Sequence, residues 1–192
     1  LLQMSLYFIL CCLSIDTSIK CFNKLKGLST SITTFQQQHS INNNKNNKEE
    51  QRSGNGIHCW KSDSMKIIAN KISGHRDGIY FEFVKNSVIW RNVSKNNLRY
   101  GLHFMFSNDD MYVNNVFRNN GSGVSVMYSN RIKMFSNYFE ENWGDAAHGI
   151  LLKEISDGFM EGNYFKRNTS GIYMEGANRI YMKRNVFENN GW

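Results

Sequence analysis

The sequence predicts an all-β protein whose main part is a right-handed parallel β-helix of about six coils, each 22–26 residues long. A glycine followed by an aliphatic residue recurs six times, at Gly56, Gly78, Gly101, Gly123, Gly149 and Gly171. An asparagine stands fourteen residues after every one of these glycines, at Asn70, Asn92, Asn115, Asn137, Asn163 and Asn185. Repeats of this length are typical of solenoid proteins, in which each repeat forms one coil.

Three apolar positions in each repeat indicate three short strands. The first, third and fifth residues after the glycine form an alternating run, which in the second repeat is Ile79, Phe81 and Phe83. Further apolar residues recur eleven and sixteen residues after the glycine, and only Ser94 interrupts the second of these columns. Such alternation of β-branched and aromatic residues is typical of strands with one buried face, so we expect all of these positions to point into the core. Three strands leave no room for a helix in so short a repeat.

The recurring glycines and asparagines are expected at the corners between strands. Equal positions in successive coils stack about 4.8 Å apart, so their side chains form columns. Asparagine tolerates the left-handed backbone region, and stacked amides can hydrogen-bond to one another along a column. Glycine would supply a positive φ at the other corner. A second asparagine stands five residues after the first in five repeats, at Asn97, Asn120, Asn142, Asn168 and Asn190.

The amino-acid composition excludes few classes of function. The chain of 192 residues has a net charge of +7 but no run of basic residues, so it gives no indication of nucleic-acid binding. It contains no proline, which suits strands whose N–H groups are all used in ladders. Its four cysteines form no C-x-x-C pair and no disulfide framework, and they therefore leave the compartment open.

Residues 1–53 share nothing with the repeat and are expected to form a separate, non-repeat segment. Residues 4–15 are an apolar run that is too short to span a bilayer and is similar to the core of a signal peptide, although no basic residue precedes it. Residues 30–52 are polar and rich in Asn, Gln and Lys, which is typical of a disordered linker. The repeats in residues 54–192 have no evident cap, so we expect them to be part of a longer β-helix.

A candidate metal site lies on the outer side of the first predicted strand. His103, Met105 and Met127 are expected to project outward from two adjacent coils, and His148 precedes the same strand two coils after His103. Thioether and imidazole ligands suit soft Cu(I), so we predict that His103, Met105, Met127 and His148 form a copper site. The alternative is that this aromatic and Met-rich surface binds a partner or is covered by the N-terminal segment.

Two further features are interpreted as surface structure. Asp109, Arg131, Asp157 and Arg179 alternate in sign up the stack, and we expect an exposed charge ladder that contributes little stability. The longest repeat has four extra residues near residues 143–148. Insertions in solenoids often carry a binding site, and a tolerated loop is the alternative.

An enzymatic function is the main alternative hypothesis for a protein with this fold. Residues 107–110, 131–133 and 148–149 resemble polygalacturonase motifs, but the histidine motif follows the Arg-x-Lys motif here instead of preceding it. Glycoside chemistry needs two carboxylates across one cleft, whereas the neighbours Asp109 and Asp110 should point to opposite faces. We therefore expect no catalysis. A carbohydrate-active β-helix enzyme of the lyase, hydrolase or epimerase type remains the alternative, and a purely structural repeat domain is a third.

Four stretches resemble the NosD family of nitrous oxide reductase maturation proteins more specifically than the repeat itself does. They are Gly74–Phe83, Arg99–Asp109, Leu151–Asp157 and Gly171–Gly176. The resemblance implies a periplasmic β-helix that acts with an ABC-type ATPase and its membrane subunit, together helping to assemble the copper–sulfur centre of nitrous oxide reductase. A copper chaperone is a further expected partner. We therefore predict a non-catalytic accessory protein that docks its partners and holds copper in transit.

Overall fold

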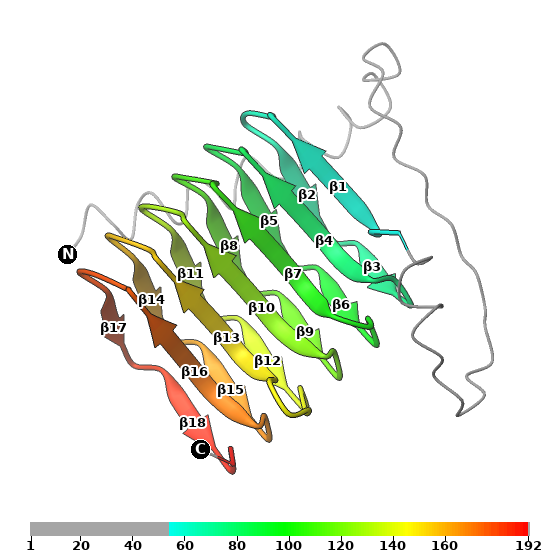
Figure 1. The fold of residues 1–192 in the computed structure, drawn as a ribbon, viewed down its shortest axis with the longest axis vertical. Helices are drawn as coiled ribbons and strands as arrows, with labels where there is room; N and C mark the ends of the chain where they lie inside the picture. Colours follow the sequence, from blue (N-terminus) through cyan, green and yellow to red (C-terminus); the bar gives the residue numbers. More distant parts are fainter. Residues whose placement is uncertain (1–53, 192) are drawn as a thin grey trace. The chain divides into compact units, whose positions relative to one another are not determined.

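The computed structural model describes residues 54–191, which form a parallel β-helix and confirm the predicted all-β fold. Three successive strands make one coil, and each strand pairs with the strand three places later in the chain (Figure 1). Residues 54–191 contain no helix, and therefore none that could cross a membrane. The predicted signal-like run and linker in residues 1–53 lie outside the described residues.

The first sheet contains most of the glycines that open the repeats. Its strand order is β1-β4-β7-β10-β13-β16. The strands are β1 (Ile57–Trp60), β4 (Asp77–Glu82), β7 (Tyr100–Met105), β10 (Ser122–Met127), β13 (His148–Lys153) and β16 (Ser170–Glu175). Their length gives this sheet the broadest outer face of the three.

The other two sheets are built from strands of three residues each. The second sheet consists of β2 (Lys66–Ile68), β5 (Val88–Trp90), β8 (Met111–Val113), β11 (Lys133–Phe135), β14 (Phe159–Glu161) and β17 (Tyr181–Lys183). The third consists of β3 (Lys71–Ser73), β6 (Val93–Lys95), β9 (Val116–Arg118), β12 (Tyr138–Glu140), β15 (Tyr164–Lys166) and β18 (Val186–Glu188). The apolar columns eleven and sixteen residues after the glycine are the central residues of these strands.

Successive coils are stacked in register, even across the longest repeat. Val124 of β10 pairs with Ile150 of β13, because the extra residues of that repeat lie between β12 and β13 and leave the strands aligned. Inside the coils, the ring centroids of Phe117, Phe139 and Phe165 follow one another at 5.4 and 4.8 Å. Burial of such a side chain contributes about 1.5–3 kcal/mol, so these stacked phenylalanines stabilise the interior substantially.

The predicted asparagine columns are present and hold neighbouring coils together. The Asn115 Oδ1 accepts hydrogen bonds from the backbone N–H of Asn92 at 2.9 Å and from its Nδ2 at 3.0 Å. The Asn115 Nδ2 donates to the carbonyl oxygen of Ile89 at 2.9 Å and to the Oδ1 of Asn137. Each buried amide is thus satisfied by the coil on either side, as buried polar groups require.

The prediction that the asparagines themselves adopt the left-handed conformation at the corners is wrong. The left-handed residue is the one before each asparagine, as at Arg91 (φ 56°) and Asn114 (φ 52°), and not the asparagine itself. The asparagine side chain therefore works as a hydrogen-bonding bridge, and the residue before it makes the turn. Residues such as arginine accept this conformation because the ladder fixes the backbone on both sides.

The glycines that open the repeats are required by space and not by a positive φ. Within residues 54–191 the glycines with positive φ are Gly74, Gly162 and Gly176, none of which opens a repeat. A Cβ atom at Gly101 would lie 2.7 Å from the carbonyl oxygen of Gly123 in the next coil. Only glycine permits this approach of one coil to the next.

The fifth residue after the glycine does not face the core, contrary to the expectation from alternation. Phe83, Phe106 and Tyr128 occupy this position in three successive coils, have φ values of 54°, 52° and 52°, and are exposed. The strand ends one residue earlier, and the left-handed turn carries the side chain outward. Their rings stack on one another at 5.1 Å centroid separations. We call these three residues the aromatic column.

Ser94, which interrupts the apolar column of the third sheet, is buried without an unmet hydrogen bond. It pairs in register with Ile72 and Phe117. Its hydroxyl donates to the carbonyl oxygen of Gly101 at 2.7 Å and accepts from the Asn97 Nδ2 at 3.0 Å. The polar side chain therefore fits this interior position because it joins the second asparagine column.

Candidate metal centre

Three of the four predicted metal ligands lie on the outer face of the first sheet, on adjacent strands. His103 and Met105 belong to β7, where alternation puts residues two apart on the same side. Met127 of β10 stands directly opposite Met105 in the strand register. Neighbouring strands lie about 4.8 Å apart, so the two sulfur-bearing side chains leave the sheet side by side.

His103 is much more buried than an outward-facing residue was expected to be. It is only 6% exposed, because its ring lies 5.0 Å from the ring of Tyr80 and 4.8 Å from that of Tyr100. Neither ring nitrogen of His103 has a hydrogen-bond partner, and neither does the buried hydroxyl of Ser125, which is opposite His103 on β10. An unsatisfied buried polar group costs about 1–3 kcal/mol, which a ligand bound here would offset.

The two methionines are half-buried on the same face. The Tyr80 hydroxyl donates a weak hydrogen bond to the Met105 sulfur, with 3.7 Å between the two atoms. This contact fixes the direction of the thioether and leaves its second lone pair free. Among residues 54–191 there is no group of three or more His, Cys, Asp and Glu residues that could hold a metal, so a metal on this face depends on the thioethers.

His148 is separated from the other three predicted ligands. It lies on β13, two strands from β7, and its backbone N–H donates to the Ser122 Oγ at 2.9 Å. Two strand spacings alone put about 10 Å between it and the strand of His103. The His148 ring instead stacks on that of Tyr173, at a centroid distance of 5.1 Å. The structure thus places His148 on the same sheet but outside the cluster of His103, Met105 and Met127.

An ion pair between the buried Asp77 and the partly exposed Arg99, next to His103, was not predicted from the sequence. The Arg99 Nε donates to the Asp77 Oδ1 at 2.9 Å, and its Nη2 donates to the Oδ2 at 2.6 Å. The same Oδ2 lies 3.7 Å from the His103 Nδ1. Burial raises the pKa of the Asp77 carboxyl, but the hydrogen bonds and charge of Arg99, with a contribution from His103, outweigh it and hold the pKa at about 2.

The signal for this ion pair was present in the sequence. Asp77 and Arg99 are 22 residues apart, one coil, which is also the spacing of Asp109 and Arg131 in the predicted charge ladder. Asp77 immediately precedes the glycine that opens its repeat, however, and that position lies outside the alternating run from which the outer face was predicted. A search for opposite charges one coil apart would have found the pair.

The predicted charge ladder is confirmed. Arg131 contacts both carboxylate oxygens of Asp109, at 2.6 and 2.8 Å, and Arg179 contacts Asp157 in the same way. Asp110, by contrast, is fully buried, and its Oδ1 accepts the backbone N–H of Ser87. Asp109 and Asp110 therefore point to opposite faces as expected, and they do not form a pair of carboxylates across a cleft.

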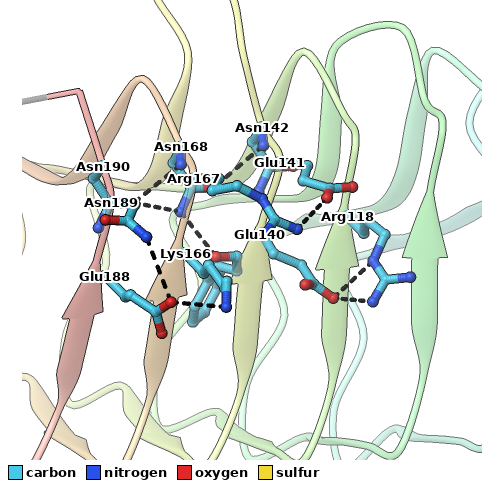
Figure 2. A network of polar contacts seen from close by, with 11 residues as sticks. Arg118, Glu140, Glu141, Asn142, Lys166, Arg167, Asn168, Glu188, Asn189 and Asn190 are labelled. Carbon is cyan, nitrogen blue, oxygen red and sulfur yellow. Dashed lines mark hydrogen bonds and ion pairs between the residues drawn. The ribbon is translucent and has the colours of Figure 1, made fainter.

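The outer face of the third sheet carries a second set of charged residues, shown in Figure 2. Arg118 pairs with Glu140, and Arg167 pairs with Glu141. Further along, the Lys166 Nζ lies 2.8 Å from the Glu188 Oε1. Each pair joins neighbouring coils, so these charges are satisfied within the face, whereas Lys71 and Lys95 of the same sheet are exposed without an ion pair among the described residues.

Comparison with known proteins gives one family. A sequence model of the family described as "Periplasmic copper-binding protein (NosD)" matches residues 36–192. No curated protein matches the chain in a sequence search.

Two solved structures share the fold. The A-module of the mannuronan C-5 epimerase AlgE4 from Azotobacter vinelandii superposes with a TM-score of 0.62 and 14% identity, over 71% of this chain and 44% of that one. A mutant of the periplasmic alginate epimerase AlgG superposes with a TM-score of 0.51 and 18% identity, over 71% of this chain and 41% of that one. The chain thus spans less than half the length of either epimerase, and identities this low show a common fold alone.

Proposed function

The chain belongs to the NosD family of periplasmic copper-binding proteins, and we propose that it is a non-catalytic accessory protein that holds Cu(I) on the outer face of its first sheet. The observation that supports this site most strongly is the state of His103. A buried imidazole whose nitrogens make no hydrogen bond, and whose Nδ1 has only the Asp77 carboxylate at 3.7 Å, lies two residues from Met105, which stands opposite Met127. The unmet hydrogen-bonding capacity and the soft sulfur atoms therefore occur at the same place.

The chemistry of these side chains favours copper in its lower oxidation state. Thioether sulfur and neutral imidazole are soft or borderline donors and select Cu(I) over harder divalent ions. His103, Met105 and Met127 would hold the ion as cargo, while His148 lies too far along the sheet to complete the same site. A set of three neutral donors suits an ion that is passed on and not retained.

The family name supports a role in assembling the copper centre of nitrous oxide reductase in the periplasm. The partners we propose are the reductase, an ABC-type ATPase with its membrane subunit, and a copper chaperone. The exposed aromatic column follows Met105 and Met127 directly in the chain, so a partner that binds its apolar rings would also reach the thioethers. The full chain should release no product from alginate or pectate, since docking and not catalysis is the proposed role.

A Cu(I) competition titration under reducing conditions tests the site. Cys11, Cys12 and Cys21 are first replaced by serine, because thiolates bind Cu(I) strongly. The remaining Cys59 is buried in the hydrophobic core, where the ion has little access to it, and it is present in every variant compared. In this background, replacing Met105 and Met127 together with leucine keeps the bulk, removes both sulfurs, and should weaken Cu(I) binding at least about tenfold.

The matched control replaces Met174 and Met182 with leucine. These two methionines are exposed in the last coil, so the control removes the same number of sulfurs away from His103 and should leave copper affinity unchanged. Equal Cu(I) affinity in the parent and in the Met105/Met127 variant would refute the site. If that variant also lost binding to the reductase, the face would be a docking surface only.

A further inference from the structure

The carboxylate nearest His103 is placed where it would be expected to join a metal site. Asp77 is fully buried, and its Oδ2 lies 3.7 Å from the His103 Nδ1. A carboxylate oxygen and an imidazole nitrogen are both Zn(II) ligands, and together they would supply two of the four positions of a tetrahedral Zn(II) site. The His103 imidazole therefore lies near two kinds of donor: the soft thioethers of Met105 and Met127, and the harder carboxylate of Asp77.

Arg99 binds the harder donor, which is the Asp77 carboxylate. Its guanidinium contacts both oxygens of Asp77, at 2.9 and 2.6 Å, and its Cζ lies 4.9 Å from the ring centroid of Tyr100. A bidentate pair of this kind is among the strongest and most directional contacts in proteins. The second arginine nearby, Arg76, approaches the Oδ2 only to 3.9 Å and donates instead to Asn55 at 3.3 Å. Arg99 is thus the group that keeps both carboxylate oxygens engaged.

We propose that Arg99 determines the metal specificity of this site by withholding the Asp77 carboxylate from any ion bound at His103. This rests on the copper site proposed above. With Arg99 in place, an incoming ion finds neutral imidazole and thioether donors next to a guanidinium. The guanidinium and the carboxylate neutralise one another, so the effect of Arg99 comes from the oxygen donor that it keeps engaged. Zn(II) uses carboxylate oxygens as ligands, whereas Cu(I) prefers soft donors, so Arg99 disfavours Zn(II) more than Cu(I).

The test replaces Arg99 with glutamine in the full chain with the three N-terminal cysteines changed to serine. Zn(II) binding is measured by competition with a chromophoric chelator, and Co(II) absorption reports whether a protein oxygen and nitrogen coordinate the ion. Arg99→Gln should bind Zn(II) about tenfold or more tightly than the parent, the scale on which groups contacting a metal ligand change affinity. Cu(I) affinity should change much less. Zn(II) affinity equal to that of the parent, in a folded variant, would overturn the proposal.

A matched control comes from the charge ladder. Arg131→Gln removes the same bidentate contact with an aspartate one coil away, but at an exposed corner away from His103. It should gain no Zn(II) affinity, and a gain equal to that of Arg99→Gln would show that any freed aspartate suffices and would overturn the proposal. Adding Asp77→Asn to Arg99→Gln should abolish the gain, and a gain that persists would equally refute it.

A second variant covers the case in which Arg99→Gln fails to fold. Arg99→Lys keeps the positive charge but contacts one oxygen instead of two, so it should give a smaller gain in Zn(II) affinity. No gain in a folded Arg99→Lys variant would then count against the proposal.

These outcomes are independent of the thioethers. If replacing Met105 and Met127 left Cu(I) binding unchanged while Arg99→Gln still gained Zn(II), the copper site would fail and the role of Arg99 would stand.

Discussion

The outer faces of the first and third sheets are built on the same stacked backbone but differ in how their polar side chains are satisfied. On the third sheet, Arg118 pairs with Glu140 and Lys166 with Glu188, each one coil away (Figure 2). On the first sheet, the buried His103 and Ser125 stand opposite one another without a hydrogen-bond partner for either side chain. These charges of the third sheet are paired between coils, whereas the side chains of His103 and Ser125 on the first sheet make no hydrogen bond.

The difference indicates where a ligand-binding site can occur on a fold made of repeats. Register pairing puts equal positions of neighbouring coils side by side, so a side chain is satisfied whenever the next coil supplies its complement. Arg118 and Glu140 meet this condition, and His103 and Ser125 do not. A repeat in which the complement is missing is therefore the place to look for a ligand.

The interior of the β-helix also contains buried polar groups without a hydrogen bond. The Asp110 Oδ2 and the Tyr112 hydroxyl are buried next to one another, and neither makes a hydrogen bond of ordinary geometry. Both lie inside the coils, since Tyr112 is a central residue of β8 and its ring is 4.4 Å from that of Phe104. An unsatisfied group in the core has no access to a ligand, so we expect it to reduce stability without serving a site.

The largest expected effect comes from breaking the ladder that supports both faces. Asn115→Ala removes the acceptor for two groups of Asn92 and the donor to the carbonyl oxygen of Ile89. Each orphaned buried group costs about 1–3 kcal/mol, so the free energy of unfolding should fall by about 3 kcal/mol or more. Urea denaturation measures this. A loss below about 1 kcal/mol would show that water replaces the ladder and that the asparagine columns do not hold the coils together.

A smaller effect, with a defined pH dependence, is expected at Asp110. Burial raises the pKa of its carboxyl to about 7, against the opposing hydrogen bond from the Ser87 backbone N–H. Ionisation therefore destabilises the fold. The penalty is absent below the unfolded-state pKa of about 4, grows between pH 4 and pH 7, and is complete above pH 7.

Asp110→Asn mimics the protonated carboxyl and can still accept from Ser87. It should raise the free energy of unfolding by about 1–3 kcal/mol at pH 8 and by nearly nothing at pH 4. Denaturation of both proteins at the two pH values measures this. Equal stabilisation at pH 4 and pH 8 would contradict the account, because it would not come from the charge.

The smallest effect is expected on the third sheet. Glu140→Gln breaks the contact with Arg118, whose side chain is half exposed. Exposed pairs of this kind contribute about 0–1 kcal/mol, so stability should change within that range and Cu(I) affinity should not change. Denaturation and the copper titration check both statements. A loss of Cu(I) binding here would remove the distinction between the two faces.

Most of the fold could be predicted because residues that are one repeat apart in the sequence lie side by side in neighbouring coils. The fourteen-residue offset between glycine and asparagine located the coils, and the apolar columns located the second and third sheets. Phe83 was misplaced because alternation does not reveal where a strand ends. An aromatic residue fits a core column and an exposed stack equally well, and only the left-handed turn decides between them.

Less of the candidate site could be predicted. The pairing of Met105 with Met127 followed from equal positions in adjacent repeats. The burial of His103 did not, because it results from the rings of Tyr80 and Tyr100 folding over it. The separation of His148 from the cluster was not predicted either, since lying on the same face does not bring residues two strands apart into contact.

The most direct test of the central claim is the copper-edge X-ray absorption spectrum of the full chain loaded with one equivalent of Cu(I). The three N-terminal cysteines are replaced by serine for this measurement. We expect thioether sulfur and imidazole nitrogen around the ion, and loss of the sulfur signal when Met105 and Met127 become leucine but not when Met174 and Met182 do. A parent spectrum with nitrogen and oxygen neighbours only, or a sulfur signal that survives loss of Met105 and Met127, would contradict it.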